Sequence, residues 1–237
     1  MSRLAMSAAL ALALAAPAAR AQPAAPYVLA KSTLLGAPDR WDYVVFDPST
    51  RRVYVAHGDR LTVVEAGSGE VVGQVEGVPG GTHGTAISAA TGQGFTDDGQ
   101  AGAAVAFDLK TLKLTRTIHA DQDADAMVAE PATGHVFVIE GDPGAITVID
   151  PKADAAIATI KAGEKLEYAA AGEPGVIYVA GNRNSDLLKI DARTNAVVAR
   201  WPTPDCSSPH GLAYDAAGRR LFMGCVNSKL MVLDASS

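Results

Sequence analysis

The chain repeats itself about every 42 residues, and this period is the strongest constraint on its fold. The repeat is marked by an aromatic column whose members are 41, 42, 41 and 44 residues apart: Tyr54, Phe95, Phe137, Tyr178 and Phe222. Around each aromatic residue stand short runs rich in Val, Ile and Thr, separated by turn residues, as in Arg52–Ala56 and Leu61–Glu65. Such runs are typical of β-strands. Each copy therefore predicts four short antiparallel strands, A to D.

Four-stranded antiparallel units of this length are typical of the blades of a β-propeller, whose radial packing buries faces that one blade alone leaves exposed. The sequence thus predicts an all-β fold with a single propeller domain over residues 22–237. The fifth copy is incomplete, because it lacks strand D. The expected blades are residues 41–81, 82–122, 123–164, 165–208 and 209–237.

The first 21 residues have the pattern of a secretory signal peptide. Arg3 precedes an apolar run from Leu4 to Ala16, and Ala19–Ala21 forms a small-residue cleavage site. The run is too short for a membrane anchor, so membrane insertion is not expected. We expect cleavage after Ala21 and a periplasmic location, with secretion from the cell as the second choice.

The charge balance limits the partners. The chain has 26 Asp and Glu against 20 Lys and Arg, with no basic run, and removal of Arg3 and Arg20 makes it more acidic. Such a chain is poorly suited to nucleic acid. We expect a monomer whose partner is an unidentified small ligand or a periplasmic protein.

Strand alternation sends the A–B and C–D turns to one face of a propeller and the B–C and D–A loops to the other. The C–D turns begin with an acidic residue in every copy: Glu65, Asp108, Asp150, Asp191 and Asp234. Acidic side chains at this position bond backbone N–H groups ahead of them. We interpret this column as turn chemistry and the opposite face as the one that carries function.

The repeats resemble those of the YncE-like family of periplasmic YVTN-repeat β-propellers. The matching text is "VYVAHGDRLTVVEAGSGEVVGQV" and "VIYVAGNRNSDLLKIDARTNAVVARW", and "WDY", "HG" and "CSSPHGLAYDAAGRRLFMGC" look like elements of one subgroup. The resemblance covers residues 27–237. It implies a propeller in the periplasm, with no well-defined activity, and a ring that usually has seven blades.

Seven blades of this length exceed the 237 residues of the chain, which leaves two interpretations. In the first, the strand-like segment 27–35 supplies the missing D strand and closes a five-bladed ring. In the second, the chain holds about five blades of a seven-bladed ring, and the same segment closes that larger ring. We favour the second.

An ionisable residue stands at the entry to strand A in every copy, at spacings of 41, 42, 42 and 43: Asp42, His83, Asp125, Glu167 and His210. Since strand A is the innermost strand of a blade, we expect these five residues to ring the mouth of the central channel. We call them the mouth ring. His57 follows a strand B on the same face and is added as a candidate ligand-binding residue.

The chemistry of the mouth ring allows several roles. Carboxylate oxygens suit calcium, and imidazole nitrogen with carboxylate oxygen suits zinc or a similar ion, so all five ring members are candidate metal ligands. The same groups could recognise a small ligand, supply a general acid and base, or only solvate the channel mouth. No cofactor other than a divalent metal ion is indicated.

No catalytic residue is assigned, because the chain has no G-x-S-x-G, H-E-x-x-H or C-x-x-C-H motif. The sequence therefore favours a non-catalytic scaffold that binds a ligand, a metal or a protein through the charged face. The alternative is a metal-assisted hydrolase or lactonase that uses the mouth ring. A role accessory to periplasmic redox or cofactor metabolism is a third, weaker idea.

The two cysteines, Cys206 and Cys225, flank the A and B strands of the fifth copy. If Tyr214 pairs near Arg220, Cys225 lies opposite Pro209, within reach of Cys206 on the incoming loop. An oxidising compartment favours a Cys206–Cys225 disulfide. The alternative is a zinc site formed by both thiols and His210.

Overall fold

The computed structural model describes residues 28–236, so the predicted signal peptide, residues 1–21, lies outside the described part. The chain divides into two compact units, Met1–Ser32 and Thr33–Ser237. In the first unit, the described residues 28–32 form neither strand nor helix. All regular structure described below belongs to the second unit.

The described part of the second unit consists of nineteen β-strands and no helix, which confirms the all-β prediction. The strands form five antiparallel sheets in chain order, four with four strands and one with three. Blade 1 comprises β1 (Val44–Asp47), β2 (Arg52–His57), β3 (Arg60–Glu65) and β4 (Val71–Val75). Blade 2 comprises β5 (Thr85–Ser88), β6 (Gln93–Asp98), β7 (Ala103–Asp108) and β8 (Leu114–His119).

The other three sheets continue the same order. Blade 3 comprises β9 (Ala124–Ala129), β10 (Val136–Glu140), β11 (Ala145–Asp150) and β12 (Ala155–Lys161). Blade 4 comprises β13 (Leu166–Ala171), β14 (Val176–Gly181), β15 (Asp186–Asp191) and β16 (Ala196–Pro202). Blade 5 comprises β17 (Pro209–Asp215), β18 (Arg220–Cys225) and β19 (Lys229–Asp234).

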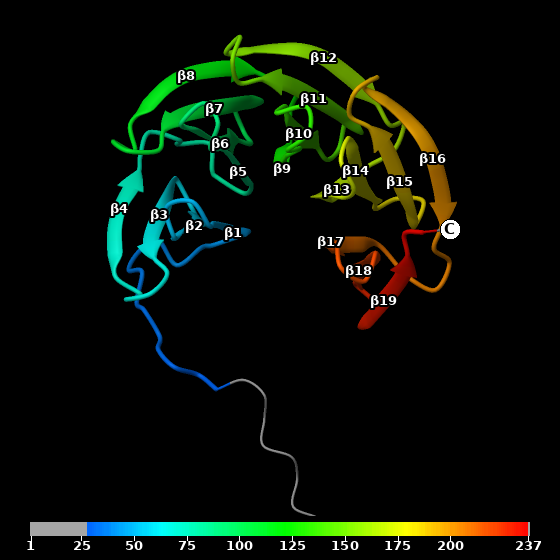
Figure 1. The fold of residues 1–237 in the computed structure, drawn as a ribbon, viewed down its shortest axis with the longest axis horizontal. Helices are drawn as coiled ribbons and strands as arrows, with labels where there is room; N and C mark the ends of the chain where they lie inside the picture. The colour runs from blue at the N-terminus through cyan, green and yellow to red at the C-terminus, as the bar shows by residue number, and fades with distance from the viewer. Residues whose placement is uncertain (1–27, 237) are drawn as a thin grey trace, which may run out of the picture. The chain divides into compact units, whose positions relative to one another are not determined.

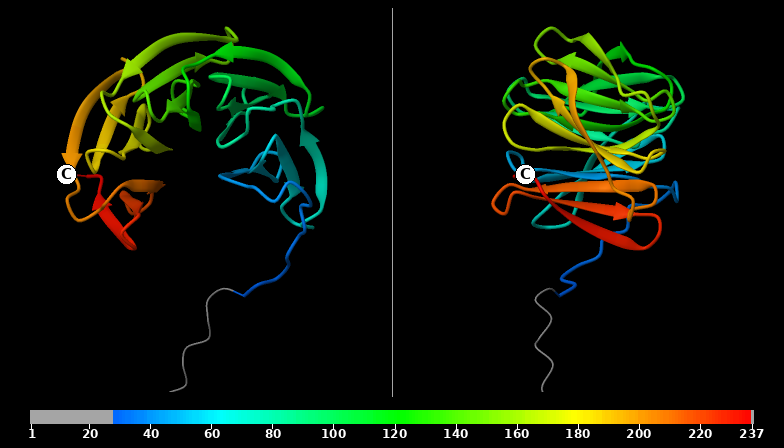
Figure 2. Two further views of the ribbon diagram at one scale, coloured as in Figure 1. Left: turned by 180° about the vertical axis from the view of Figure 1, so that it is seen from behind. Right: turned by 90° about the vertical axis from the view of Figure 1, so that its right-hand side faces the viewer.

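The five sheets are arranged as the blades of a β-propeller, which confirms the predicted fold class. The first strand of each blade lies innermost, and in the four blades that have four strands the fourth lies on the rim (Figure 1). Figure 2 shows the same arrangement from behind and from the side, with neighbouring blades packed face to face. The entry to each innermost strand is therefore directed to one central region.

The segment predicted as a closing strand does not form one. No residue of 28–35 is in a strand, and Tyr27 lies outside the described residues. Thr33 instead donates its hydroxyl to the carbonyl oxygen of Gly69 at 2.6 Å, in the turn between β3 and β4. A single side-chain hydrogen bond replaces the expected ladder of backbone pairs, and blade 5 has three strands among the described residues.

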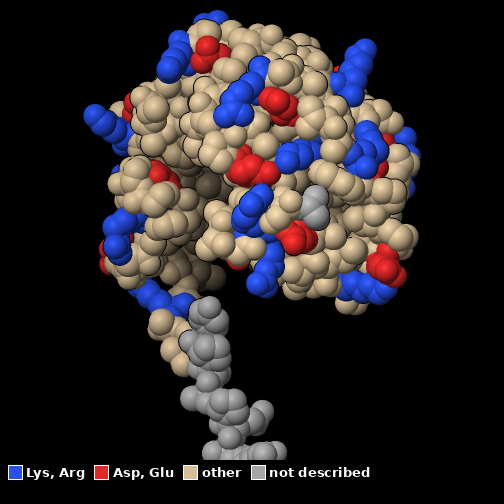
Figure 3. All heavy atoms as spheres, turned by 45° about the vertical axis from the view of Figure 1, so that its right-hand side comes forward, with Lys and Arg blue, Asp and Glu red and all other residues tan. Residues whose placement is uncertain are grey.

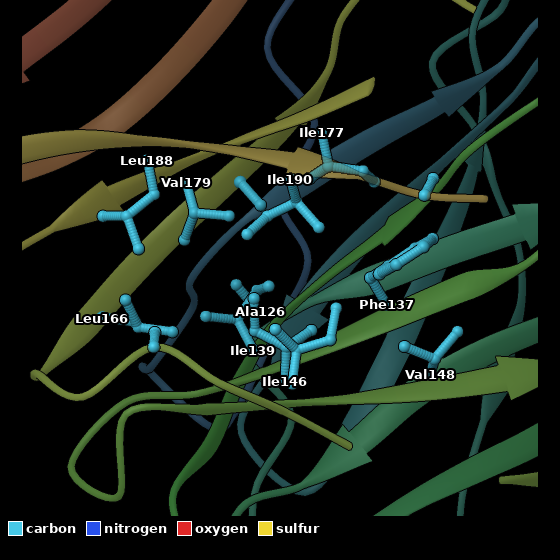
Figure 4. Close-up of a cluster of buried hydrophobic side chains, with 14 residues drawn as sticks. Ala126, Phe137, Ile139, Ile146, Val148, Leu166, Ile177, Val179, Leu188 and Ile190 are labelled. Atoms are coloured by element: carbon cyan, nitrogen blue, oxygen red, sulfur yellow. The ribbon is translucent and has the colours of Figure 1, made fainter. Parts of the chain in front are cut away.

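The apolar core lies between the blades. Between blades 3 and 4, Phe137, Ile139 and Ile146 pack with Leu166 and Leu188 in one buried cluster (Figure 4). The aromatic column contributes to this core in four blades, where its members are buried, whereas in blade 5 the aromatic residue is half-buried: Tyr54, Phe95, Phe137, Tyr178 and Phe222. Burial of apolar surface between sheets is thus the main stabilising contribution.

The acidic residues that begin the C–D turns act as predicted. Asp108 accepts hydrogen bonds from the backbone N–H groups of Lys110 and Thr111 at 3.0 and 2.7 Å. Equivalent backbone N–H bonds are accepted by the other four members: Glu65, Asp150, Asp191 and Asp234. These bonds hold the pKa of Asp108 below its usual range, because they stabilise the charged form.

Cys206 and Cys225 form a disulfide, as predicted, and this excludes the alternative zinc site with His210. Pro209 lies opposite Cys225 in the β17–β18 ladder. The expected register was one residue off, because Tyr214 pairs with Leu221 rather than with Arg220. An irregularity between Pro209 and Leu212 restores the predicted partner of Cys225.

Removal of the disulfide should destabilise the propeller. The bridge spans 19 residues, and a loop of this size corresponds to about 3 kcal/mol in the chain-entropy treatment. We expect the double variant Cys206→Ala/Cys225→Ala to lose about that free energy of unfolding, measured by urea denaturation. A variant with the same urea midpoint as the wild type would contradict this expectation.

Truncation of one core side chain should show that blade packing determines stability. Ile139 is fully buried between blades 3 and 4, so Ile139→Ala should cost about 2–5 kcal/mol of unfolding free energy. The matched control is Ile157→Ala on β12, where the side chain is 46% exposed. The control should change the unfolding free energy by less than about 0.5 kcal/mol, and equal losses in both variants would refute the interpretation.

Candidate functional site

The repeat brings the mouth ring to one end of the innermost strands. Asp125, Glu167 and His210 are each the second residue of an innermost strand, β9, β13 and β17. Asp42 and His83 lie two residues before β1 and β5. The five residues therefore come from five separate blades, and their side chains interact with one another, as the distances and charges below show. The innermost strands that carry or follow them are labelled in Figure 1.

Three members of the mouth ring converge closely. One potential ligand atom from each of Asp42, His83 and Asp125 lies within 4.8 Å of the other two. Asp42 is exposed, whereas His83 and Asp125 are half-buried. The three residues belong to consecutive blades, and they combine one imidazole with two carboxylates.

The other two members pair with each other. His210 Nδ1 lies 3.1 Å from Glu167 Oε2, and the amide nitrogen of Asn182 donates to Glu167 Oε1 at 3.0 Å. Glu167 is therefore engaged at both oxygens. The charge of His210 also acts on Asp42 and Asp125, so the pair and the group of three form one electrostatic unit.

Asp97, at the end of β6, holds His83 in place. Its carboxylate lies 2.7 Å from His83 Nδ1 and accepts the backbone N–H groups of His83 and Gly84 at 3.0 and 2.6 Å. On the other side of the ring, a guanidinium nitrogen of Arg40 lies 3.3 Å from His83 Nε2. Since Arg40 can only donate, neutral His83 carries its proton on Nδ1 and exposes a lone pair at Nε2.

Burial and charge shift the ionisation of the whole site. Partial desolvation by neighbouring groups raises the pKa of Asp42, Asp125 and Glu167, and the nearby histidines offset only part of this rise. The hydrogen bond to Asp97 raises the pKa of His83. Burial also raises the pKa of Asp97 to about 6, against the lowering effect of its bond to His83. The mouth ring is therefore a place where added positive charge is favourable.

Two tyrosines lie directly beyond the mouth ring. Tyr43 follows Asp42 and Tyr168 follows Glu167, and their ring centroids are 4.3 Å apart. Burial raises the pKa of Tyr43, and the charges of Asp125, Asp42 and Glu167 add to that rise, so its hydroxyl stays protonated at neutral pH. The polar mouth ring therefore borders on an aromatic pair formed across blades 1 and 4.

His57 does not offer a free nitrogen to a ligand. The residue is fully buried, with Nδ1 at 2.8 Å from the Thr62 hydroxyl and Nε2 at 2.6 Å from the Pro38 carbonyl oxygen. Both ring nitrogens are thus engaged inside blade 1 and the segment before it. This geometry does not support the predicted ligand-binding role of His57. The residue stands next to a loop of the predicted functional face, but its side chain is buried and both ring nitrogens already have partners.

Sequence reasoning missed Asp97, although its position carried a signal. The residue two places after the aromatic column is apolar or glycine in four copies and acidic in one: Ala56, Asp97, Ile139, Ala180 and Gly224. A lone carboxylate in a core-facing column requires a partner. That partner is His83, which is 14 residues away in the sequence.

The surface carries charges of both signs. On the face seen in Figure 3, acidic and basic side chains alternate rather than gather into a single patch. No helix that could cross a membrane is present among residues 28–236.

The comparisons with known proteins support the β-propeller fold and assign neither a family nor a function. No protein-family model matches the sequence, and no curated protein sequence matches it significantly. Among solved structures, the chain is similar to one described as "Kuenenia stuttgartiensis Hydrazine Synthase", with a TM-score of 0.72 at 14% identity. The match covers 84% of this chain and 59% of that one, so this chain spans under two-thirds of its length.

The Asp97–His83 bond predicts a pH effect. Because the bond raises the pKa of His83, the stabilisation that the bond provides is present near the ordinary value of 6.5 and is lost as the pH rises through the raised value. In metal-free protein, NMR titration should place the His83 pKa above 6.5, and Asp97→Asn should lower it. The variant should also show a weaker loss of stability between neutral and mildly alkaline pH. An unchanged His83 titration in Asp97→Asn would rule out this explanation.

Proposed function

We propose that this protein is a non-catalytic periplasmic β-propeller that binds a divalent metal ion at its channel mouth. The observation that carries the proposal is the convergence of Asp42, His83 and Asp125, whose ligand atoms lie within 4.8 Å of one another. One nitrogen and two oxygen donors suit zinc or a similar transition metal ion better than calcium, which prefers oxygen alone.

The surroundings of His83 support the same conclusion. A metal-binding histidine usually donates its second ring N–H to a carboxylate, which orients the ring and strengthens the free nitrogen as a ligand. Asp97 is placed to accept that proton at 2.7 Å. Binding at Nε2 requires Arg40 to turn away, because its guanidinium now faces this nitrogen at 3.3 Å. A bound cation would also relieve the crowding of negative charge that Asp42 and Asp125 impose on each other.

The proposed periplasmic location is supported by the disulfide, which persists in oxidising compartments, and by the resemblance of the repeats to the YncE-like family. The structural likeness to a hydrazine synthase chain supports the propeller as the scaffold that presents the site. We further propose that the protein is monomeric and that a small ligand or a periplasmic protein approaches the metal from the open side of the mouth ring.

Metal titration tests the site. We expect the full-length mature protein, freed of metal by chelation, to bind one Zn²⁺ per chain in isothermal titration calorimetry. His83→Ala should abolish tight binding, because it removes the only nitrogen donor of the group of three. Asp97→Asn should weaken binding by about 10- to 100-fold, since it removes the carboxylate that orients the ligand.

The matched control is His119→Ala, which removes an exposed imidazole on the rim strand β8. It should bind Zn²⁺ as the wild type does. Unchanged binding in His83→Ala would contradict the proposed site.

The proposal that the protein is not an enzyme is tested separately, with lactones and esters on zinc-loaded protein. This test is needed because the raised pKa of Asp125 and of Glu167 also suits acid–base chemistry. Hydrolysis that disappears in Asp125→Ala/Glu167→Ala would identify a metal-assisted hydrolase instead.

A further inference from the structure

A groove separates blades 2 and 3 on the rim side of the propeller, away from the mouth ring. Its volume is about 550 Å³, within the range of small-molecule sites. One wall is β8 with the loop that follows, and the other is formed by blade 3. The polar side chains that line it include Arg116, His119, Asp121, Glu140, Thr147 and Thr159.

Glu140, at the end of β10, lines this groove and is fully buried. Its Oε1 accepts the Thr147 hydroxyl at 2.5 Å and the Asp121 backbone N–H at 2.9 Å. Its Oε2 is buried and has no hydrogen-bond partner among the described residues. Because a buried carboxylate oxygen without a partner is costly, this position calls for a donor that the chain does not supply.

The corresponding position between blades 3 and 4 contains such a donor, Arg200. There the guanidinium of Arg200 on β16 contacts the buried carboxylates of Glu164 and Asp186, the latter at 2.9 Å. It also donates to the carbonyl oxygen of Ala162 at 2.6 Å. An arginine side chain thus fills the space between these two blades and neutralises the acidic groups in it.

The strand register shows that blade 3 has no counterpart of Arg200. Arg200 pairs with Leu188, and the equivalent pair in blade 3 is Thr159 with Thr147. Ala120 takes the place of Ala162, since their N–H groups bond the equivalent carbonyls of Gly102 and Gly144. Ala145 stands where blade 4 has Asp186, but its cross-strand partner Glu140, the equivalent of Gly181, supplies a buried carboxylate instead. The groove between blades 2 and 3 therefore has a buried acidic side chain in the same strand pair and no arginine at the position equivalent to Arg200.

We propose that this groove binds the guanidinium group of a small molecule, which takes the place that Arg200 occupies one blade further on. The acidic lining favours a cation, because Asp121, Glu140 and Asp154 outnumber Arg116. A planar guanidinium can donate to Glu140 Oε2 and to other acceptors at once. Because that oxygen is covered in the structure, neighbouring side chains must part on binding, which keeps the expected affinity modest.

Agmatine, which carries a guanidinium group and an ammonium group at the two ends of a short alkyl chain, is a suitable cationic probe for calorimetry on the intact mature protein. We expect one saturable site per chain, with binding at least about tenfold weaker in Glu140→Gln, which retains the shape of the side chain and removes its charge. Thr159→Arg should abolish agmatine binding and raise the urea midpoint, because it places an arginine beside Glu140 at the position equivalent to Arg200. The control Asp125→Asn, at the channel mouth, should bind agmatine as the wild type does.

A heptapeptide with a central arginine, titrated in parallel, distinguishes a free guanidinium compound from one carried on a peptide. Tighter binding of the peptide, with the same dependence on Glu140, would assign the guanidinium to a peptide and overturn the small-molecule part of the proposal. If the wild type binds neither probe saturably, the site itself is overturned. The same conclusion follows if Glu140→Gln or Thr159→Arg binds agmatine with the affinity of the wild type. Loss of agmatine binding in Asp125→Asn would place it at the mouth ring and refute the groove.

Discussion

The packing of one blade against the next is the constraint on which the rest of this structure depends. A four-stranded sheet has two faces, and a blade can bury both only between neighbours. Ile139 of blade 3 and Leu188 of blade 4 meet in one such layer. Buried apolar clusters also join blades 1 and 2, blades 2 and 3, and blades 4 and 5, and the innermost strands face one central region (Figure 1). The convergence of the mouth ring is thus a consequence of apolar packing.

The candidate site lies where this apolar pattern is interrupted. Asp97 occupies a column that is otherwise apolar or glycine, and it is buried for the same reason as its equivalents. Its cost is offset by the bond to His83 and by two backbone N–H groups. Partial desolvation raises the pKa of Asp42 and Asp125 nearby, so the region gains from an added cation. The repeat thus places apolar residues in the core and, at the equivalent position in blade 2, the carboxylate that orients His83.

The repeats also show how one position takes different roles. The last residue of the second strand of each blade differs in every copy: His57, Asp98, Glu140, Gly181 and Cys225. His57 bonds Thr62 inside blade 1, Asp98 caps the following turn, and Cys225 forms the disulfide. Glu140 alone among the described members keeps a buried oxygen without a partner. Divergence within a fixed scaffold thus produces distinct local chemistry without change of fold.

The period by itself determined the strands, the five blades, the turn-capping acids and the ring of residues at the entry to each innermost strand. These features repeat with the chain, and the disulfide needed only one local ladder. Only the tertiary structure decided that residues 28–35 form no strand, that His57 is enclosed, and that Asp97 holds His83. The contacts of His57 with Pro38 and of Asp97 with His83 join residues 19 and 14 positions apart in the sequence, and the repeat period does not predict such pairs. Position within a repeat therefore does not show whether a side chain is enclosed in the structure or accessible to a ligand. Burial and the contacts between blades decide this.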